Sequence, residues 1–396
     1  MKYKIQGSYS LQQFSLWGSY GLLFSYANRY LLAQGMSNTE AGLLLGIVTA
    51  MAFVLQPLLT SVVDRSGLSC RGVMFLGTGL TVLSCGGLLI FTQFWPQVLL
   101  YGLACVALQV LPSFSNALGM AAIHRGERLN FSLARGFGTL SFGAGAQLAV
   151  PLMDRYGLGV IPAGTAIMCL LLLLSCIPFS HSKAQSAEEN PDPIGVFFRN
   201  NKPFVLFLAA VTLLYVGHNV LCNCMYQIAV HKGDGNAQGT ALLISAIAEL
   251  PTMFGFALLL KWANSGKWVC VSGVFVTLRL LLSLLLPGIE GLYAAQICQM
   301  LGYALLCIST VYYVGQTVDK RNVVKGQTYL GITNTLGSLI AHFSGGTMID
   351  LWGVEAMMLI CSAVCGAGMV LLFIAVHRQS VKERNSEKNL ASTSEL

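Results

Sequence analysis

The amino-acid sequence predicts an all-helical integral membrane protein, in which about twelve transmembrane helices form two halves of six. Three observations support this fold class: the composition, a series of long apolar segments, and the sorting of basic residues between the connections. The chain of 396 residues is 55% hydrophobic and only 10% charged, whereas a soluble domain carries about 25% charged residues. The alternation of polar and apolar residues that is typical of membrane barrels is not seen.

Long apolar segments follow one another along most of the chain. A hydrocarbon core of about 30 Å requires roughly 20 apolar residues per helix. The expected spans are 10–33, 40–63, 72–93, 97–121, 132–153, 158–179, 203–230, 240–262, 268–287, 291–316, 327–349 and 354–377. Only Pro287 and Gly288 separate the ninth span from the tenth. A cleavable signal peptide is not expected, because Gln12 and Gln13 precede an apolar segment that is too long for one.

Basic residues mark the cytoplasmic side. With the N-terminus inside, the inner connections carry Arg65, Arg71, Arg125, Arg128, Lys183, Arg199, Lys202, Lys261, Lys267, Lys320, Arg321 and Lys325. The outer connections carry Arg155 and Lys232. This asymmetry is the positive-inside pattern, so we expect a multi-pass protein of the cell (inner or plasma) membrane with both termini in the cytoplasm. The net charge of +7 reflects this sorting and does not indicate nucleic-acid binding.

One long polar stretch divides the chain into similar halves. The expected organisation is an N-terminal half at 1–180, a cytoplasmic central loop at 181–202, a C-terminal half at 203–378 and a cytoplasmic polar tail at 379–396. Residues 42–67 align without gaps to residues 241–266, and the fifth and eleventh spans end in the related tetrapeptides DRYG (154–157) and DLWG (350–353). Two such halves are typical of secondary transporters, whose solute site lies between the halves near the bilayer midplane.

Glu249 is the one acidic residue that lies deep inside a long apolar segment. A charge at mid-membrane depth costs about 2.5–3.5 kcal/mol on insertion scales, so it is rarely kept without a partner or a function. Arg279 lies in the next span. The turn near Ser265 leaves arcs of about 15 residues, or ~22 Å of helix, on each side. We therefore expect an antiparallel hairpin that brings Glu249 and Arg279 to similar depth, where they pair.

Two roles fit this pair. In a functional role Glu249 carries a proton and Arg279 is its switching partner, because burial favours the neutral form of a carboxyl group and a nearby Arg favours the ionised form. In a structural role Glu249 is a permanently protonated, hydrogen-bonded core acid, or Arg279 is a structural cation satisfied by helix carbonyls and Glu249. Arg135, near the inner end of the fifth span, could bind a solute hydroxyl or snorkel to the interface. Arg29, near the outer end of the first span, is expected at the membrane interface, where it could attract an anion.

Polar side chains recur on one face of several spans. They are Gln109, Ser113 and Asn116; Asn219, Cys222 and Tyr226; Ser245, Glu249 and Thr252; Gln296, Gln299 and Tyr303; and Asn334, Ser338 and His342. Any single stripe is also typical of contacts that hold membrane helices together. Five stripes and a charge pair together favour a polar central cavity for a neutral, hydrogen-bonding solute.

Cofactor chemistry is not expected. The twelve cysteines are scattered, mostly inside apolar segments, and form no CxxC pair, which is typical of small, reduced, buried residues. No HExxH or GxSxG-type motif is evident, and the buried acid has no apparent catalytic partners, so an enzyme is not expected either.

The chain resembles the major facilitator superfamily along nearly all its length. Residues 56–58 (QPL) and 64–67 (DRSG), followed by Arg71, are similar to the superfamily's cytoplasmic DRxGRR-type loop in a degraded form. This resemblance implies the major facilitator fold of two six-helix halves. It also implies a gating role for Asp64 and Arg65.

Within the superfamily the chain is most similar to the lactose permease (oligosaccharide:proton symporter) branch. Residues 134–138 (ARGFG) resemble the branch's sugar-binding Arg segment, residues 248–250 (AEL) its essential Glu, and residues 276–280 (VTLRL) its essential Arg. Other charges of the branch are replaced. Gly302 stands at its proton-carrying Glu, Gln299 at the neighbouring His, Gly337 at its span-eleven Lys, Met120 near its span-four Glu, and His218 and Asn219 where span seven carries an Asp.

The sequence therefore predicts a secondary active transporter that imports a small polar solute, such as a sugar or a nucleoside, together with protons. Glu249 and Arg279 are expected to couple protons. The expected solute-binding residues are Tyr20, Asn116, Arg135, His218, Asn219, Tyr226, Gln299 and Asn334. The expected partners are the solute, protons and the lipid bilayer. Nucleic-acid binding is not expected, and the protein is expected to function as a monomer. Proton-driven efflux of an amphiphilic compound and a non-transporting membrane sensor are the alternatives.

Overall fold

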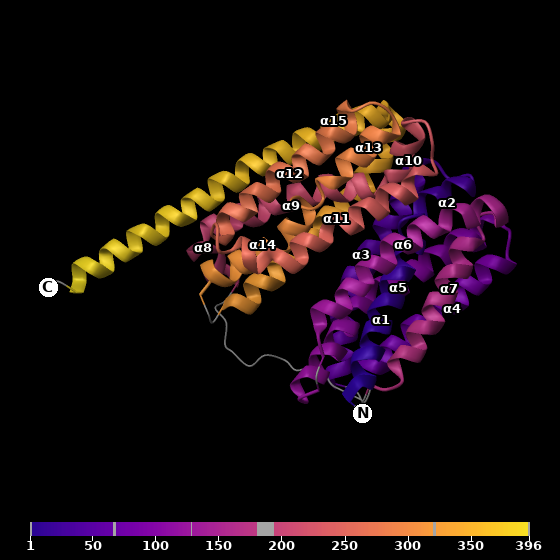
Figure 1. Cartoon of the computed structure of the whole chain (residues 1–396), viewed down its shortest axis with the longest axis horizontal. Coiled ribbons are helices and arrows are strands. Elements are labelled where there is room, and N and C mark those ends of the chain that lie inside the picture. The colour runs from indigo at the N-terminus through magenta and orange to yellow at the C-terminus, as the bar shows by residue number, and fades with distance from the viewer. Residues whose placement is uncertain (1, 66–68, 128, 180–193, 320–321, 395–396) are drawn as a thin grey trace.

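A computed structural model describes residues 2–65, 69–127, 129–179, 194–319 and 322–394 of the chain (Figure 1). This part of the chain is almost entirely helical and contains no strand, which confirms the all-helical prediction. Seven of its helices are long and apolar enough to cross a membrane. The expected count of twelve separate spans remains a prediction, because several expected spans are divided or joined in the structure.

The first part of the chain forms seven helices. They are α1 (Lys2–Leu23), α2 (Ala27–Ala33), α3 (Asn38–Arg65), α4 (Cys70–Ile90), α5 (Phe94–His124), α6 (Phe131–Tyr156) and α7 (Val160–Cys176). The expected first span is divided into α1 and α2. α3 begins with a capping box, in which the backbone N–H of Ser37 donates to Glu40 Oε2 and the backbone N–H of Glu40 donates to Ser37 Oγ, an arrangement that satisfies free N–H groups at a helix start.

The second part forms helices α8 to α15. They are α8 (Ile194–Asn200), α9 (Lys202–Asn223), α10 (Met225–His231), α11 (Ala237–Leu259), α12 (Ser265–Leu285), α13 (Gly288–Ile297), α14 (Tyr303–Thr317) and α15 (Val323–Ser394). The two last expected spans are joined in α15, where Gly353 forms a kink with φ of 81°. Only glycine adopts such a backbone conformation without strain.

The expected tenth span is broken between α13 and α14. Residues 298–302 form turns there, and Thr252 Oγ1 of α11 donates to the free carbonyl of Met300 at 2.7 Å. Backbone groups that leave a helix inside a membrane need such partners. Broken helices at this depth are typical of transporter binding sites.

Buried apolar side chains form two clusters. One contains residues of α1–α7 together with Leu242 of α11, and the other contains residues of α8–α15. We call these groups of helices the N-terminal bundle and the C-terminal bundle. Residues 180–193, which include most of the expected central loop, lie outside the described part of the chain.

The two bundles meet at one end and diverge toward the end where the N-terminus lies (Figure 1). The meeting end is the expected outer side. There α3 packs against α15, and α6 packs against α11. The approach of α3 to α15 is so close that a Cβ atom on Gly346 would lie 2.0 Å from the carbonyl oxygen of Asn38. Glycine is therefore required at this position to keep the outer ends together.

Candidate functional site

A buried guanidinium group is the centre of the candidate site. Arg279 of α12 is only 2% exposed. Its Nε donates to Gln296 Oε1 at 3.1 Å, and its Nη2 donates to Ser245 Oγ at 3.3 Å. Its Nη1 donates to Gln299 Oε1 and lies 3.3 Å from His218 Nδ1. Because a guanidinium can only donate, His218 must accept at Nδ1 and is therefore neutral in this arrangement.

Glu249 and Arg279 are joined through an amide rather than directly. Gln299 Nε2 donates to Glu249 Oε1 at 2.8 Å, while Gln299 Oε1 accepts from Arg279. Among the described residues, no ion pair within 4.0 Å links the two charges. The expectation of a direct pair is therefore wrong for this conformation. The physical reason is that uncharged groups on α9, α11 and α13 and at the break before α14 already surround the guanidinium.

Arg135 approaches from the N-terminal bundle. Its Cζ atom lies 3.6 Å from the centre of the Trp17 ring on α1, which is a cation–π contact. Trp17 Nε1 in turn donates to Gln13 Oε1 at 3.0 Å. Arg135 and Glu249 also interact electrostatically, so the N-terminal bundle contributes a cation to the surroundings of the buried acid. Trp17 was missed from the sequence, because nothing in the spacing of the first and fifth spans links it to Arg135.

The other expected solute-binding residues differ in the contacts they make. His218 stacks on Tyr303 with ring centres 4.0 Å apart, and Asn219 Nδ2 donates to Asn334 Oδ1 at 3.2 Å. Tyr20 donates weakly to the Leu108 carbonyl at 3.4 Å. Asn116 is exposed on α5.

We call Arg135, His218, Glu249, Arg279, Gln296 and Gln299 the central cluster.

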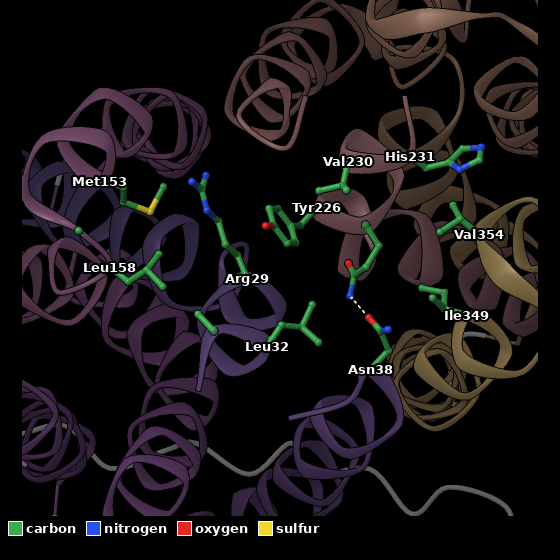
Figure 2. A pocket seen from close by; sticks show the side chains of 13 residues that line it. Arg29, Leu32, Asn38, Met153, Leu158, Tyr226, Val230, His231, Ile349 and Val354 are labelled. Atoms are coloured by element: carbon green, nitrogen blue, oxygen red, sulfur yellow. Dashed lines mark hydrogen bonds between the residues drawn. The ribbon is translucent and has the colours of Figure 1, made fainter. Parts of the chain in front are cut away.

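Tyr226 lies elsewhere. It lines a separate cavity between the outer ends of the bundles, next to Arg29 (Figure 2). Its expected place on a stripe with Asn219 is wrong because α9 ends at Asn223 and a new helix, α10, begins at Met225. The expected gating residues Asp64 and Arg65 end α3, but their side chains lie outside the described part of the structure, so their role stays a prediction.

Hydrogen bonds cross between the bundles at the outer end. The carboxylate of Asp350, on α15, accepts from the side chain of Asn38 and from the backbone N–H and hydroxyl of Thr39, each at 2.7 Å. Asp154, on α6, accepts from Asn236 Nδ2 at 3.2 Å. Arg29 Nη1 donates to Asn236 Oδ1 at 2.9 Å. We call these bonds the outer contacts.

Two residues of the outer contacts stand out in the sequence, but only because they belong to a segment that is repeated in the two halves. Asp350 and Asp154 begin the two related tetrapeptides at the ends of the eleventh and fifth expected spans. Their contacts with the opposite bundle were not predicted, because the alignment of the halves says nothing about which residues face each other.

The described part of the chain contains no group of three or more His, Cys, Asp or Glu side chains that could hold a metal ion. The twelve cysteines are free thiols, buried or half-buried. The polar groups of the central cluster can bind hydrogen-bonding groups of a solute and can exchange a proton at Glu249.

Comparison with known proteins agrees with the fold. Residues 7–390 match the MFS_1 like family. The maltose permease of Geobacillus stearothermophilus is 22% identical over 383 residues, which cover 94% of each chain. The structure of the nucleoside transporter NupG has a TM-score of 0.76 at 18% identity and covers 95% of this chain and 99% of that one.

A POT family transporter in complex with a thioalcohol conjugated peptide shares the fold as well. Its TM-score is 0.71 at 11% identity, with 95% of this chain and 96% of that chain covered. These relatives are membrane transporters and not enzymes, and the resemblance to the major facilitator superfamily is confirmed. The chain therefore belongs to the MFS_1 like family and is a multi-pass membrane transporter of the major facilitator type.

Proposed function

We propose that the protein imports a small polar solute, a sugar or a nucleoside, together with protons, by alternating access between the N-terminal and C-terminal bundles. The observation that carries this proposal is the chain of contacts from Arg279 through Gln299 to Glu249, with Arg135 of the other bundle beside it. A half-buried acid between two moving bundles is suited to couple proton movement to a change of conformation.

The chemistry of the central cluster supports a neutral solute. Apart from Glu249, the groups around Arg279 are amides, a hydroxyl and a neutral imidazole. Trp17 adds an aromatic ring to the site, with Arg135 over one face, and an aromatic ring is suited to contact a sugar or a base. The maltose permease and the nucleoside transporter among the relatives favour the same solute class.

In this proposal, movement of Arg135 relative to Glu249 causes Glu249 to release or take up its proton. Gln299 and Arg279 belong to the same bundle as Glu249, so their contacts with it can persist while the bundles move. Arg135 belongs to the other bundle, and a cation that approaches a carboxyl group favours its ionised form. A closer Arg135 therefore favours proton release, and a more distant one favours proton uptake.

The proposed orientation places the outer contacts outside and both termini in the cytoplasm, with two halves of six spans. In this conformation the outer contacts hold the outer side closed. The orientation is tested with a membrane-impermeant thiol reagent in intact cells. A cysteine at Asp234 should be labelled from outside and one at Arg378 should be protected, both positions being exposed. The reverse result would contradict the orientation.

The transport proposal is tested with purified protein in liposomes that enclose a pH-sensitive dye. Maltose and uridine are added outside in turn, with an imposed proton gradient. We expect one of them to give saturable uptake with proton entry, and a protonophore to abolish accumulation against a gradient. Efflux predicts altered drug tolerance of cells without uptake, and a sensor predicts neither response.

A further inference from the structure

A cavity lies between the bundles at their outer ends, apart from the central cluster (Figure 2). Its volume is about 710 Å³, within the roughly 300–1,000 Å³ of small-molecule sites. Apolar side chains from both bundles form much of its wall. They are Leu32, Met153 and Leu158 from the N-terminal bundle, and Val230, Ile349 and Val354 from the C-terminal bundle.

Arg29 gives this cavity a positive charge. Its guanidinium lies 5.5 Å from the centre of the Tyr226 ring and donates to Asn236, but no carboxylate within 4.0 Å pairs with it in the part of the chain that the structure describes. The residues that line the cavity include no Asp or Glu. The lining itself is therefore suited to an anion, and the carboxylates of Asp350 and Glu355 lie behind it, bonded to Asn38 and His231.

Gln227 adds a free acceptor. Its side chain lines the cavity and the residue is 8% exposed. Its Nε2 donates to Asn38 Oδ1 at 2.9 Å, whereas its Oε1 has no partner among the described residues. A buried acceptor without a partner costs about 1–3 kcal/mol. A hydroxyl group that reaches this oxygen from the cavity would remove that cost.

We propose that the outer cavity binds a compact hydroxyaryl carboxylate. Its carboxylate pairs with Arg29, its ring lies between the two apolar walls and the Tyr226 ring, and its hydroxyl donates to Gln227 Oε1. The aromatic ring is preferred because the walls are apolar on both sides and Tyr226 offers a face for it. This site is distinct from the proposed transport site.

A ligand in this cavity contacts both bundles at once. The walls come together only where the outer contacts are closed, so the ligand binds this conformation better than one with separated outer ends. A ligand with such a preference shifts the equilibrium toward the conformation it binds. We therefore expect it to slow transport from the outer side without competing with the transported solute.

The probe for the first experiment is 4-hydroxyphenylacetate, with calorimetric titration of the full chain in lipid nanodiscs. Two analogues test its polar ends: 2-(4-hydroxyphenyl)ethanol lacks the carboxylate, and phenylacetate lacks the hydroxyl. We expect saturable binding of the probe, and at least about tenfold weaker binding of each analogue, since each loses a hydrogen bond to a buried or charged group. No saturable binding, or equal binding of all three compounds, would overturn the proposal.

Single substitutions test which residues of the outer cavity bind the probe. Arg29→Gln should remove the preference for the carboxylate, and Gln227→Leu should remove the preference for the hydroxyl. Asn236→Ala keeps the guanidinium but removes its partner, so it should retain the carboxylate preference if Arg29 itself binds the probe. Arg155→Gln is the matched control, because Arg155 is an exposed outer cation that does not line the cavity.

Two outcomes would overturn the assignment. Binding that is unchanged in Arg29→Gln would remove Arg29 from the site. Binding that is lost in Arg135→Gln but kept in Arg29→Gln would place the probe in the central cluster. Neither measurement depends on transport, so a failure of the proposed function leaves these results interpretable.

Discussion

The outer contacts and the central cluster differ in what their hydrogen bonds join. The outer contacts join one bundle to the other, as Asp350 does with Asn38 and Thr39. The bonds of Arg279 and Gln299 all lie within the C-terminal bundle. In an alternating-access cycle the bonds between the bundles must break in every turnover, whereas the bonds within the C-terminal bundle can persist.

The electrostatic interactions of Arg135 in the centre do cross between the bundles. Arg135 belongs to α6 and Glu249 to α11, and the two interact electrostatically. The comparison therefore assigns different effects to different residues. Substitution at Glu249 should uncouple transport, substitution elsewhere in the cluster should disable it, and substitution at the outer contacts should shift the balance of conformations.

Glu249→Gln should separate proton coupling from transport. A symporter must return either empty and deprotonated or fully loaded, so a neutral residue here should abolish uphill accumulation and leave downhill exchange measurable at saturating solute. The measurement is accumulation and counterflow in liposomes. Glu290→Gln is the matched control, because Glu290 is an exposed acid at the start of α13. Normal uphill accumulation in Glu249→Gln would leave Glu249 as a structural acid.

Arg279→Ala should disable both accumulation and exchange. The change leaves Gln299 Oε1 without the donor that Arg279 supplies, whereas Gln296 Oε1 keeps a contact with Ser245 Oγ at 3.1 Å. An unsatisfied buried acceptor costs about 1–3 kcal/mol. We expect a lower thermal midpoint and a loss of transport. Because Gln299 links Arg279 to Glu249, the double variant with Glu249→Gln should be no worse than the poorer single variant. Additive losses would show that the two residues act independently.

Gly346→Ala should open the outer side without touching the cluster. The added Cβ atom would lie 2.0 Å from the Asn38 carbonyl oxygen, so α3 and α15 must separate. Spin labels at Trp95 and Leu285, which are 69% and 70% exposed and belong to different bundles, report the outer distance. We expect a longer distance in Gly346→Ala and no change in Gly366→Ala, where an added Cβ meets nothing within 4 Å. Equal distances in both variants would contradict the role of the close approach.

The sequence predicted the centre of the molecule better than its outer end. Arc lengths around the turn near Ser265 predicted that Glu249 and Arg279 lie near each other, and both side chains contact Gln299. They did not predict the amide between them, because hydropathy does not reveal that the helix is broken at residues 298–302, where Gln299 leaves the regular helical path. The outer cavity could not be predicted at all, since it depends on how two separate bundles meet.

Asp350→Ala should shift the conformational balance by a moderate amount. Asp350 accepts from the backbone N–H of Thr39 in the first turn of α3, where a carboxylate satisfies a free donor and also interacts favourably with the helix dipole. The loss of such a cap costs about 0.5–1 kcal/mol at an exposed site, which corresponds to roughly a two- to fivefold shift toward separated outer ends. The same pair of spin labels measures it. No shift would mean that the cap has no net effect on closure.

Asp154→Ala should give the smallest effect, although Asp154 begins the tetrapeptide related to that of Asp350. Its partner is the side chain of Asn236, at 3.2 and 3.3 Å, and not a backbone N–H of α11. Exposed polar contacts of this kind contribute about 0–1 kcal/mol, and Asn236 retains its bond from Arg29 after the change. We expect a shift of less than about twofold in the ratio of open to closed outer ends, which corresponds to the lower part of that range, below about 0.4 kcal/mol. A shift as large as that of Asp350→Ala would show that the charge at the repeated position matters and that the contact with the helix start does not.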